Sequence, residues 1–197
     1  MQRYSRVKSS ETARNHAKKK TRRYWEQKPE KVAAYQEKIA DIAPEKIAYV
    51  DETGLDTFYD REYAYAPRGK TVEGLVRGRK FQRTNLVAAQ MGHEVLAPMQ
   101  YKGTTNAALF EFWFEQRLLP CLPKDAVIVM DNAAFHRKKQ LFEIADRHQH
   151  TLIFLPPYSP ELNPVERLWA WLKRKIASFL SSFSSLDDAI SFAFQVR

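Results

Sequence analysis

Three acidic side chains carry the chemistry that this sequence offers. Asp51 and Asp131 each follow a short apolar run that is typical of a buried strand, and Glu166 lies near the start of a helical pattern. Carboxylates are hard oxygen ligands that suit Mg²⁺ or Mn²⁺ better than Zn²⁺. Two such ions about 3.5–4 Å apart can activate an attacking water or hydroxyl and stabilise the leaving oxygen of a phosphodiester. The three acids therefore predict a two-metal site for phosphodiester chemistry.

Each acid also has a structural interpretation. The run Asn163-Pro164-Val165-Glu166 has the form of a capping box, which would occupy Glu166 at a helix start, and spacing alone favours capping and catalysis equally. The pair Asp131-Asn132 is a common turn after a strand. Asp51 and Glu52 are neighbours on one strand, so their side chains point to opposite faces and only one of them can join a shared site.

The elements that must position these acids follow from the hydrophobic periodicity. Helices are expected over 12–40, with an interruption near Pro29, and over 104–119, 137–148, 163–177 and 186–196. Buried strands are expected over 47–50, 126–130 and 152–155, and antiparallel hairpin strands over 62–66, 83–91 and 95–101, in the stretch that holds all six glycines. Apolar strands separated by helices favour an α/β fold with a largely parallel sheet, in which sites form beyond the carboxyl ends of the strands. Asp51 and Asp131 should therefore lie at the same end of the sheet.

Composition limits the class of protein. Of 197 residues, 44% are hydrophobic and 28% are charged, which suits a globular domain. The single cysteine, Cys121, can form neither an internal disulfide nor a Cys-rich zinc site. No apolar run reaches the roughly 18 residues that cross a bilayer, and the N-terminus lacks the apolar stretch of a secretory signal. We therefore expect a cytoplasmic protein with no membrane partner.

Positive charge is concentrated in two stretches. The net charge is +9, and residues 1–40 hold 12 lysines and arginines against 4 glutamates. A second cluster is opposed only by Glu73 and comprises Arg68, Lys70, Arg77, Arg79, Lys80 and Arg83. Lys173 shares a helix face with Glu166. Two separated basic stretches favour a nucleic acid that contacts more than one surface, although a solvated tail is the simpler interpretation of residues 1–40.

Three blocks of the sequence resemble the catalytic-domain signatures of mariner-superfamily transposases, in the bacterial insertion-sequence branch. They are Tyr49–Gly54 (YVDETG), Val127–His136 (VIVMDNAAFH) and Leu155–Lys173 (LPPYSPELNPVERLWAWLK). The stretch Tyr65–Lys70 (YAPRGK) is also similar, although a tryptophan is commoner at position 65. Between Asp131 and Glu166 lie 34 residues, the spacing associated with that branch. The resemblance covers roughly residues 46–177.

The resemblance implies a fold and a set of site residues. The fold is ribonuclease-H-like, with a mixed five-stranded sheet, three of its strands antiparallel, and helices on both faces. The resemblance matches Asp51, Asp131 and Glu166 to an acidic triad that holds two Mg²⁺ or Mn²⁺ ions. Glu166 would then both cap a helix and coordinate a metal ion. Supporting roles in shaping loops or approaching DNA are implied for Asn132, His136, Tyr158 and Asn163.

The resemblance also implies an activity and partners. Such enzymes cleave DNA at the inverted-repeat ends of a transposon and join the released 3′-hydroxyl to target DNA, usually at a TA dinucleotide, and a homodimer would bring two ends together. Full-length members carry two helix-turn-helix modules first, and only about 45 residues precede the first motif here. We therefore expect a basic helical linker (1–45), a catalytic domain (46–180) and a packed C-terminal helix (181–197). Three explanations of the missing modules stay open: the chain is one half of a split transposase with a separately encoded helix-turn-helix partner, a truncated remnant, or an isolated fragment. The expected location is the bacterial cytoplasm, in association with the nucleoid.

Two other functions stay open on the sequence. One is a catalytically silent DNA-binding or regulatory protein derived from a transposase. Salt-dependent binding of DNA without metal-dependent cleavage would favour it. The other is a ribonuclease-H-like nuclease, which would prefer an RNA–DNA hybrid over duplex DNA.

Overall fold

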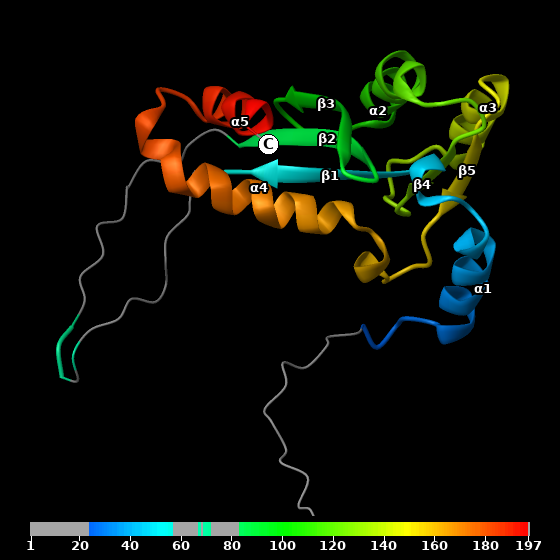
Figure 1. Ribbon diagram of the computed structural model, residues 1–197, viewed down its shortest axis with the longest axis horizontal. Coiled ribbons are helices and arrows are strands. Elements are labelled where there is room, and N and C mark those ends of the chain that lie inside the picture. The colour runs from blue at the N-terminus through cyan, green and yellow to red at the C-terminus, as the bar shows by residue number, and fades with distance from the viewer. Residues whose placement is uncertain (1–23, 57–66, 68, 72–82, 197) are drawn as a thin grey trace, which may run out of the picture.

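The computed structural model describes residues 24–56, 67, 69–71 and 83–196 (Figure 1). Within these residues the chain forms a mixed five-stranded sheet with helices on both faces, which confirms the expected fold class. The strand expected over 62–66 and the part of the expected N-terminal helix over 12–23 lie outside the described residues. So do four of the proposed DNA-contacting side chains, Arg68, Arg77, Arg79 and Lys80.

The sheet has the order β3-β2-β1-β4-β5. Its strands are β1 (Ile47–Leu55), β2 (Thr84–Met91), β3 (Glu94–Tyr101), β4 (Val127–Met130) and β5 (Thr151–Phe154). β2 pairs antiparallel with both β1 and β3, whereas β4 pairs parallel with both β1 and β5. The expected antiparallel hairpin is confirmed for β2 and β3, and the expected parallel pairing is confirmed for β1, β4 and β5. The sheet as a whole is therefore mixed rather than largely parallel.

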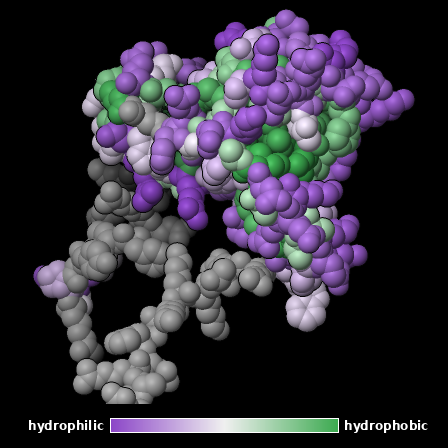
Figure 2. All heavy atoms as spheres, turned by 45° about the vertical axis from the view of Figure 1, so that its right-hand side comes forward, coloured by the Kyte–Doolittle hydropathy of each residue, from purple (hydrophilic) through white to green (hydrophobic). Residues whose placement is uncertain are grey.

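In the described part of the chain, five α-helices cover the sheet: α1 (Pro29–Ala40), α2 (Ala107–Trp113), α3 (Lys138–Arg147), α4 (Val165–Phe179) and α5 (Leu186–Gln195). One core joins α2 and α3 to a face of the sheet. On the other face, α4 and α5 pack over β1 and β2, while α1 packs over β4 (Figure 1). Within the described residues, no helix combines the length and apolarity needed to cross a membrane. Mostly hydrophilic side chains cover the visible face of the described part, interrupted by an apolar area above α1 (Figure 2).

Several predicted boundaries need correction. β1 continues to Leu55 because its outer edge pairs with β2 along its length, so Asp51 lies within the strand rather than after it. Residues 24–28 are not helical, and α1 begins at Pro29, which suits the first helical turn. The helix expected from 104 begins at Ala107, because Asn106 caps it by accepting a hydrogen bond from the Leu109 amide.

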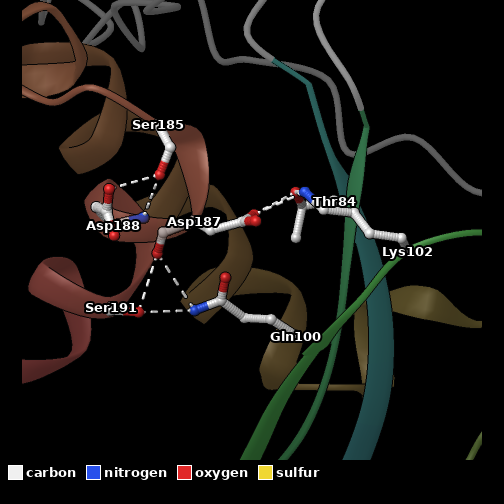
Figure 3. Close-up of polar contacts among 7 residues, drawn as sticks. All are labelled: Thr84, Gln100, Lys102, Ser185, Asp187, Asp188 and Ser191. Carbon is white, nitrogen blue, oxygen red and sulfur yellow. Dashed lines mark hydrogen bonds and ion pairs between the residues drawn. The ribbon is translucent and has the colours of Figure 1, made fainter.

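A polar network fastens α5 to the β2–β3 hairpin (Figure 3). The Asp187 carboxylate accepts hydrogen bonds from Thr84 at 2.6 Å and from Lys102 at 2.8 Å. Burial acts to raise the pKa of Asp187, but the hydrogen bonds from Lys102 and Thr84 and the charge of Lys102 together outweigh it, so that the pKa is lowered. At the start of α5, the Ser185 hydroxyl accepts from the Asp188 amide and donates to its carboxylate. The C-terminal helix is therefore joined to the sheet by polar contacts as well as by its apolar face.

Candidate metal centre

The three acids predicted from the sequence line one open pocket. This cavity of about 570 Å³ is bordered by Asp51, Asp131 and Glu166, together with parts of the loop that leads into α4. Asp51 and Asp131 are half-buried, and Glu166 is exposed. The pocket lies on the sheet face where the α4–α5 cover and the α1 cover approach each other, and Tyr49 packs against both.

The register of two parallel strands brings Asp51 and Asp131 to the same part of the sheet. β1 and β4 pair from Ile47↔Val127 to Tyr49↔Val129, so the same register extended by two residues sets Asp51 opposite Asp131. β4 ends at Met130, and the Asp131 carboxylate accepts a hydrogen bond from the Ala133 amide at 3.0 Å. The last paired residues of β1 and β4, Tyr49 and Val129, therefore lie two residues before the two acids, on the same face of the sheet.

Helix α4 supplies the third acid. Its buried stripe is the predicted one, Val165, Leu168, Leu172 and Ile176, with Trp169 added. The capping-box interpretation is wrong, because the N-cap of α4 is Pro164 rather than Asn163 and has no side-chain cap hydrogen bond. The Asn163 side chain does accept from the Val165 amide, but the Asn163 amide bonds to the Pro160 carbonyl instead of to Glu166. Because the turn at Pro160 satisfies that amide, the Glu166 carboxylate is not used for capping.

Electrostatics single out Asp51 among the acids. Burial raises the pKa of Asp51, the charges of Glu166, Glu52 and Asp131 raise it further, and the Trp169 hydrogen bond lowers it, so that together these effects bring it to about 8. No lysine or arginine of the described residues is among the causes of this shift. A buried carboxylate surrounded by like charge lacks a compensating cation, and a bound divalent ion would supply one. The donor set therefore fits Mg²⁺ or Mn²⁺.

Trp169 is a site residue that the sequence analysis missed. Its indole Nε1 donates to Asp51 Oδ2 at 2.9 Å, and the ring is only 2% exposed. The position was hidden because an apolar residue three positions after Glu166 is usual for a buried helix face. A tryptophan, unlike other large apolar residues, carries a donor that needs a partner when buried, and this was the available signal.

On the opposite face of β1, Glu52 and His136 form a second group with Asp131. His136 Nε2 lies 3.6 Å from Glu52 Oε1, and Nδ1 lies 3.7 Å from Asp131 Oδ1. One ligand atom from each of the three residues lies within 4.8 Å of the others. The His136 side chain is fully buried between Phe110 and Phe135. Glu52 was missed as a site residue, although the expected alternation of Asp51 and Glu52 is confirmed.

The other residues for which supporting roles were expected border the pocket. The Asn132 side chain donates to the Leu155 carbonyl and accepts from Lys138, a contact that the sequence did not indicate. Tyr158 is half-exposed, has a φ of +58°, and packs against Tyr24 at 6.0 Å between ring centroids. Asn163 is buried and also donates to the Val50 carbonyl at 3.2 Å.

The described basic residues do not line the pocket. Lys70 and Arg83 are exposed, and the Arg83 guanidinium donates to Asn85 at 3.1 Å and lies against Gly54. Lys173 is half-buried on α4, two turns beyond Glu166. The described members of the expected DNA-contacting set therefore lie outside the acidic pocket.

Comparison with known proteins identifies a family that matches most of this chain. The family model described as DDE superfamily endonuclease matches residues 46–189. The structure resembles a mariner Mos1 paired-end complex with Mg, with a TM-score of 0.68 and 16% identity over 94% of this chain and 59% of that one. It also resembles a Mos1 transposase catalytic domain with Raltegravir and Mn, with a TM-score of 0.56 and 16% identity over 84% and 76% of the two chains.

A sequence relative comes from a bacterium. The uncharacterized protein y4pE/y4sA of Sinorhizobium fredii is 39% identical over 71 residues. The match covers 34% of this chain and 46% of the relative. The chain therefore spans less than half the length of that relative and about three-fifths of the Mos1 paired-end chain. The likeness to the Mos1 structures shows the fold, which is that of their ribonuclease-H-like catalytic domain.

Proposed function

This chain belongs to the DDE superfamily of endonucleases, and we propose that it is the catalytic part of a transposase that cleaves DNA at transposon ends and joins them to target DNA. The observation that carries the proposal is one pocket lined by Asp51, Asp131 and Glu166, in which no cation of the described residues offsets the charge on Asp51. A site of that charge suits two divalent ions acting on a polyanion.

We assign the three carboxylates to metal binding. Bound Mg²⁺ or Mn²⁺ would supply Lewis-acid stabilisation of the phosphodiester oxygens and activation of the attacking group. The chain's own contribution is positional. The β1–β4 register sets Asp51 beside Asp131, α4 adds Glu166, and hydrogen bonds from Trp169 and from the Ala133 amide each hold one carboxylate.

DNA is the proposed partner, with backbone phosphates bound by basic side chains outside the pocket. The members of that set in the described residues are Lys70, Arg83 and Lys173. The lysines and arginines of residues 1–40 would add further contacts to phosphates. A homodimer that joins two ends, a separately encoded helix-turn-helix partner and association with the nucleoid complete the proposal. Residues 1–45 would act as the linker, 46–180 as the catalytic domain and 181–197 as its packed C-terminal helix.

The test is metal-dependent nicking of a duplex that carries the transposon end, with Asp131→Asn as the variant. We expect activity in Mg²⁺, none in EDTA, and a loss of at least about 100-fold in the variant, because metal binding stabilises the transition state by several kcal/mol. Asp146→Asn, which changes an exposed acid on α3, should keep wild-type activity.

Three results would contradict the proposal. Full activity of Asp131→Asn would remove the metal-binding assignment. DNA binding without cleavage in Mg²⁺ or Mn²⁺, even with the end-binding modules supplied in trans, would favour the silent DNA-binding protein. A preference for an RNA–DNA hybrid over duplex DNA would favour the nuclease.

A further inference from the structure

We propose that Trp169 is a positioning residue which, together with Asn163, fastens the start of α4 to β1 and so holds Glu166 beside Asp51. This inference rests on the proposed metal site. It concerns the way in which that site keeps its shape before an ion binds.

The fastening consists of two bonds to successive residues of β1. Asn163 Nδ2 donates to the Val50 carbonyl at 3.2 Å, and Trp169 Nε1 donates to Asp51 Oδ2 at 2.9 Å. Both donors are buried, with exposures of 4% for Asn163 and 2% for Trp169. Glu166 lies three residues after the first donor and three before the second, so the segment that carries it is fixed to the strand at both ends.

Repulsion makes such a fastening necessary. The charge of Glu166 acts on Asp51 more strongly than that of Glu52 or Asp131. Without an ion, ionised carboxylates on two different elements repel each other, and the apolar contacts between β1 and α4 are non-directional and do not by themselves fix Glu166 beside Asp51. The indole bond ties α4 to the very carboxylate that repels Glu166. The metal site is therefore held in a compact form that a cation can enter without rearrangement.

The chemistry of tryptophan suits this role. An indole N–H is only a donor and does not ionise, so it cannot compete with the cation or exchange protons with the site. It occupies Oδ2 of Asp51, whereas Oδ1 accepts no hydrogen bond from the described residues. Partners of this kind orient a ligand, and their loss typically weakens metal binding by 10–100-fold.

The experiment measures Mn²⁺ affinity by isothermal titration calorimetry on the full chain without DNA, for wild type, Trp169→Phe and Trp113→Phe. Trp113 is the matched control, because it is also a fully buried tryptophan whose indole donates, to the Ala97 carbonyl at 2.7 Å, but it lies in the core on the other face of the sheet. We expect about 10-fold weaker Mn²⁺ binding for Trp169→Phe and a change below about 2-fold for Trp113→Phe.

Loss of ring volume is separated from loss of the donor by a second variant. A benzothienylalanine at position 169 keeps the bicyclic ring and replaces the N–H by sulfur, and it should weaken Mn²⁺ binding as much as Trp169→Phe does. Wild-type affinity in that variant, or equal losses in the Trp169 and Trp113 variants, would overturn the inference. Absence of Mn²⁺ binding to the wild type would instead contradict the proposed function itself.

Discussion

The carboxylate of Asp51 is harder to ionise in the folded chain than in the unfolded one. Its pKa is raised from 3.8 to about 8, first by burial and then by Glu166. A group whose pKa is higher in the folded state favours folding fully below its unfolded pKa, and that contribution is lost as the pH rises through the folded value. The metal-free protein should therefore lose stability between about pH 4 and pH 8 on account of this residue.

The Asp51→Asn variant tests the direction of this pH dependence of stability. An amide keeps an acceptor for Trp169 and removes the charge, so we expect the free energy of unfolding in EDTA to rise by about 1–3 kcal/mol at pH 8 and to change little at pH 4. Chemical denaturation at the two pH values measures the difference. The same variant should lose the stabilisation that Mn²⁺ gives the wild type. A variant less stable than wild type at pH 8 in EDTA would contradict this account of Asp51.

At the residue scale, the sequence predicted the acids better than their partners. The acids have types and flanking motifs that point to metal chemistry, so Asp51, Asp131 and Glu166 could be named as candidates. Their partners could not, because Trp169 fits a core stripe equally well and the Ala133 contact uses a backbone amide. Such contacts depend on how α4 lies on the sheet, which no local pattern specifies.

At the element scale, the site follows from the different lengths of β1 and β4. β1 continues to Leu55 with β2 at its side, whereas β4 ends at Met130, so the acids lie where the parallel pairing has stopped. The apolar run at Ile47–Val50 predicted only the buried part of β1. Its polar second half is a strand because the β2 backbone pairs with it, and a partner so distant in sequence leaves no local signal.

The attachment of α5 gives a prediction at this scale. Ser185 caps the helix through the Asp188 amide at 3.1 Å, so Ser185→Ala should lower the free energy of unfolding by about 1 kcal/mol. Thermal unfolding should then shift downward by about 2–4 °C. Ser184→Ala removes only a side-chain contact to Asp188 and should shift it less. An equal shift in both variants would show that the cap does not hold α5.

At the scale of the whole molecule, the pocket lies between two covers of one sheet face. The α4–α5 layer and α1 both bury apolar side chains of that face, and the acids lie between them. The fold class was predictable because apolar strands and amphipathic helices alternate along the chain. The packing of two separate helical layers on one face of the sheet was not predictable. It depends on α1 packing over β4, which is distant from it in sequence.

The separation of charge belongs to the same scale. Acidic side chains of the described residues gather in the pocket, while in the sequence the excess of lysine and arginine lies in residues 1–40 and 68–83. This arrangement suits a polyanion that is held by its phosphates on the outside and acted on at the acids.

Two sets of possible ligands share Asp131, and one measurement distinguishes them. Anomalous diffraction from a crystal of the protein grown with Mn²⁺ locates the ion directly. Our account expects Mn²⁺ in contact with Asp51, Asp131 and Glu166, on the face of the sheet that α4 covers. Mn²⁺ bound between Glu52, Asp131 and His136, with Asp51 and Glu166 unliganded, would contradict it.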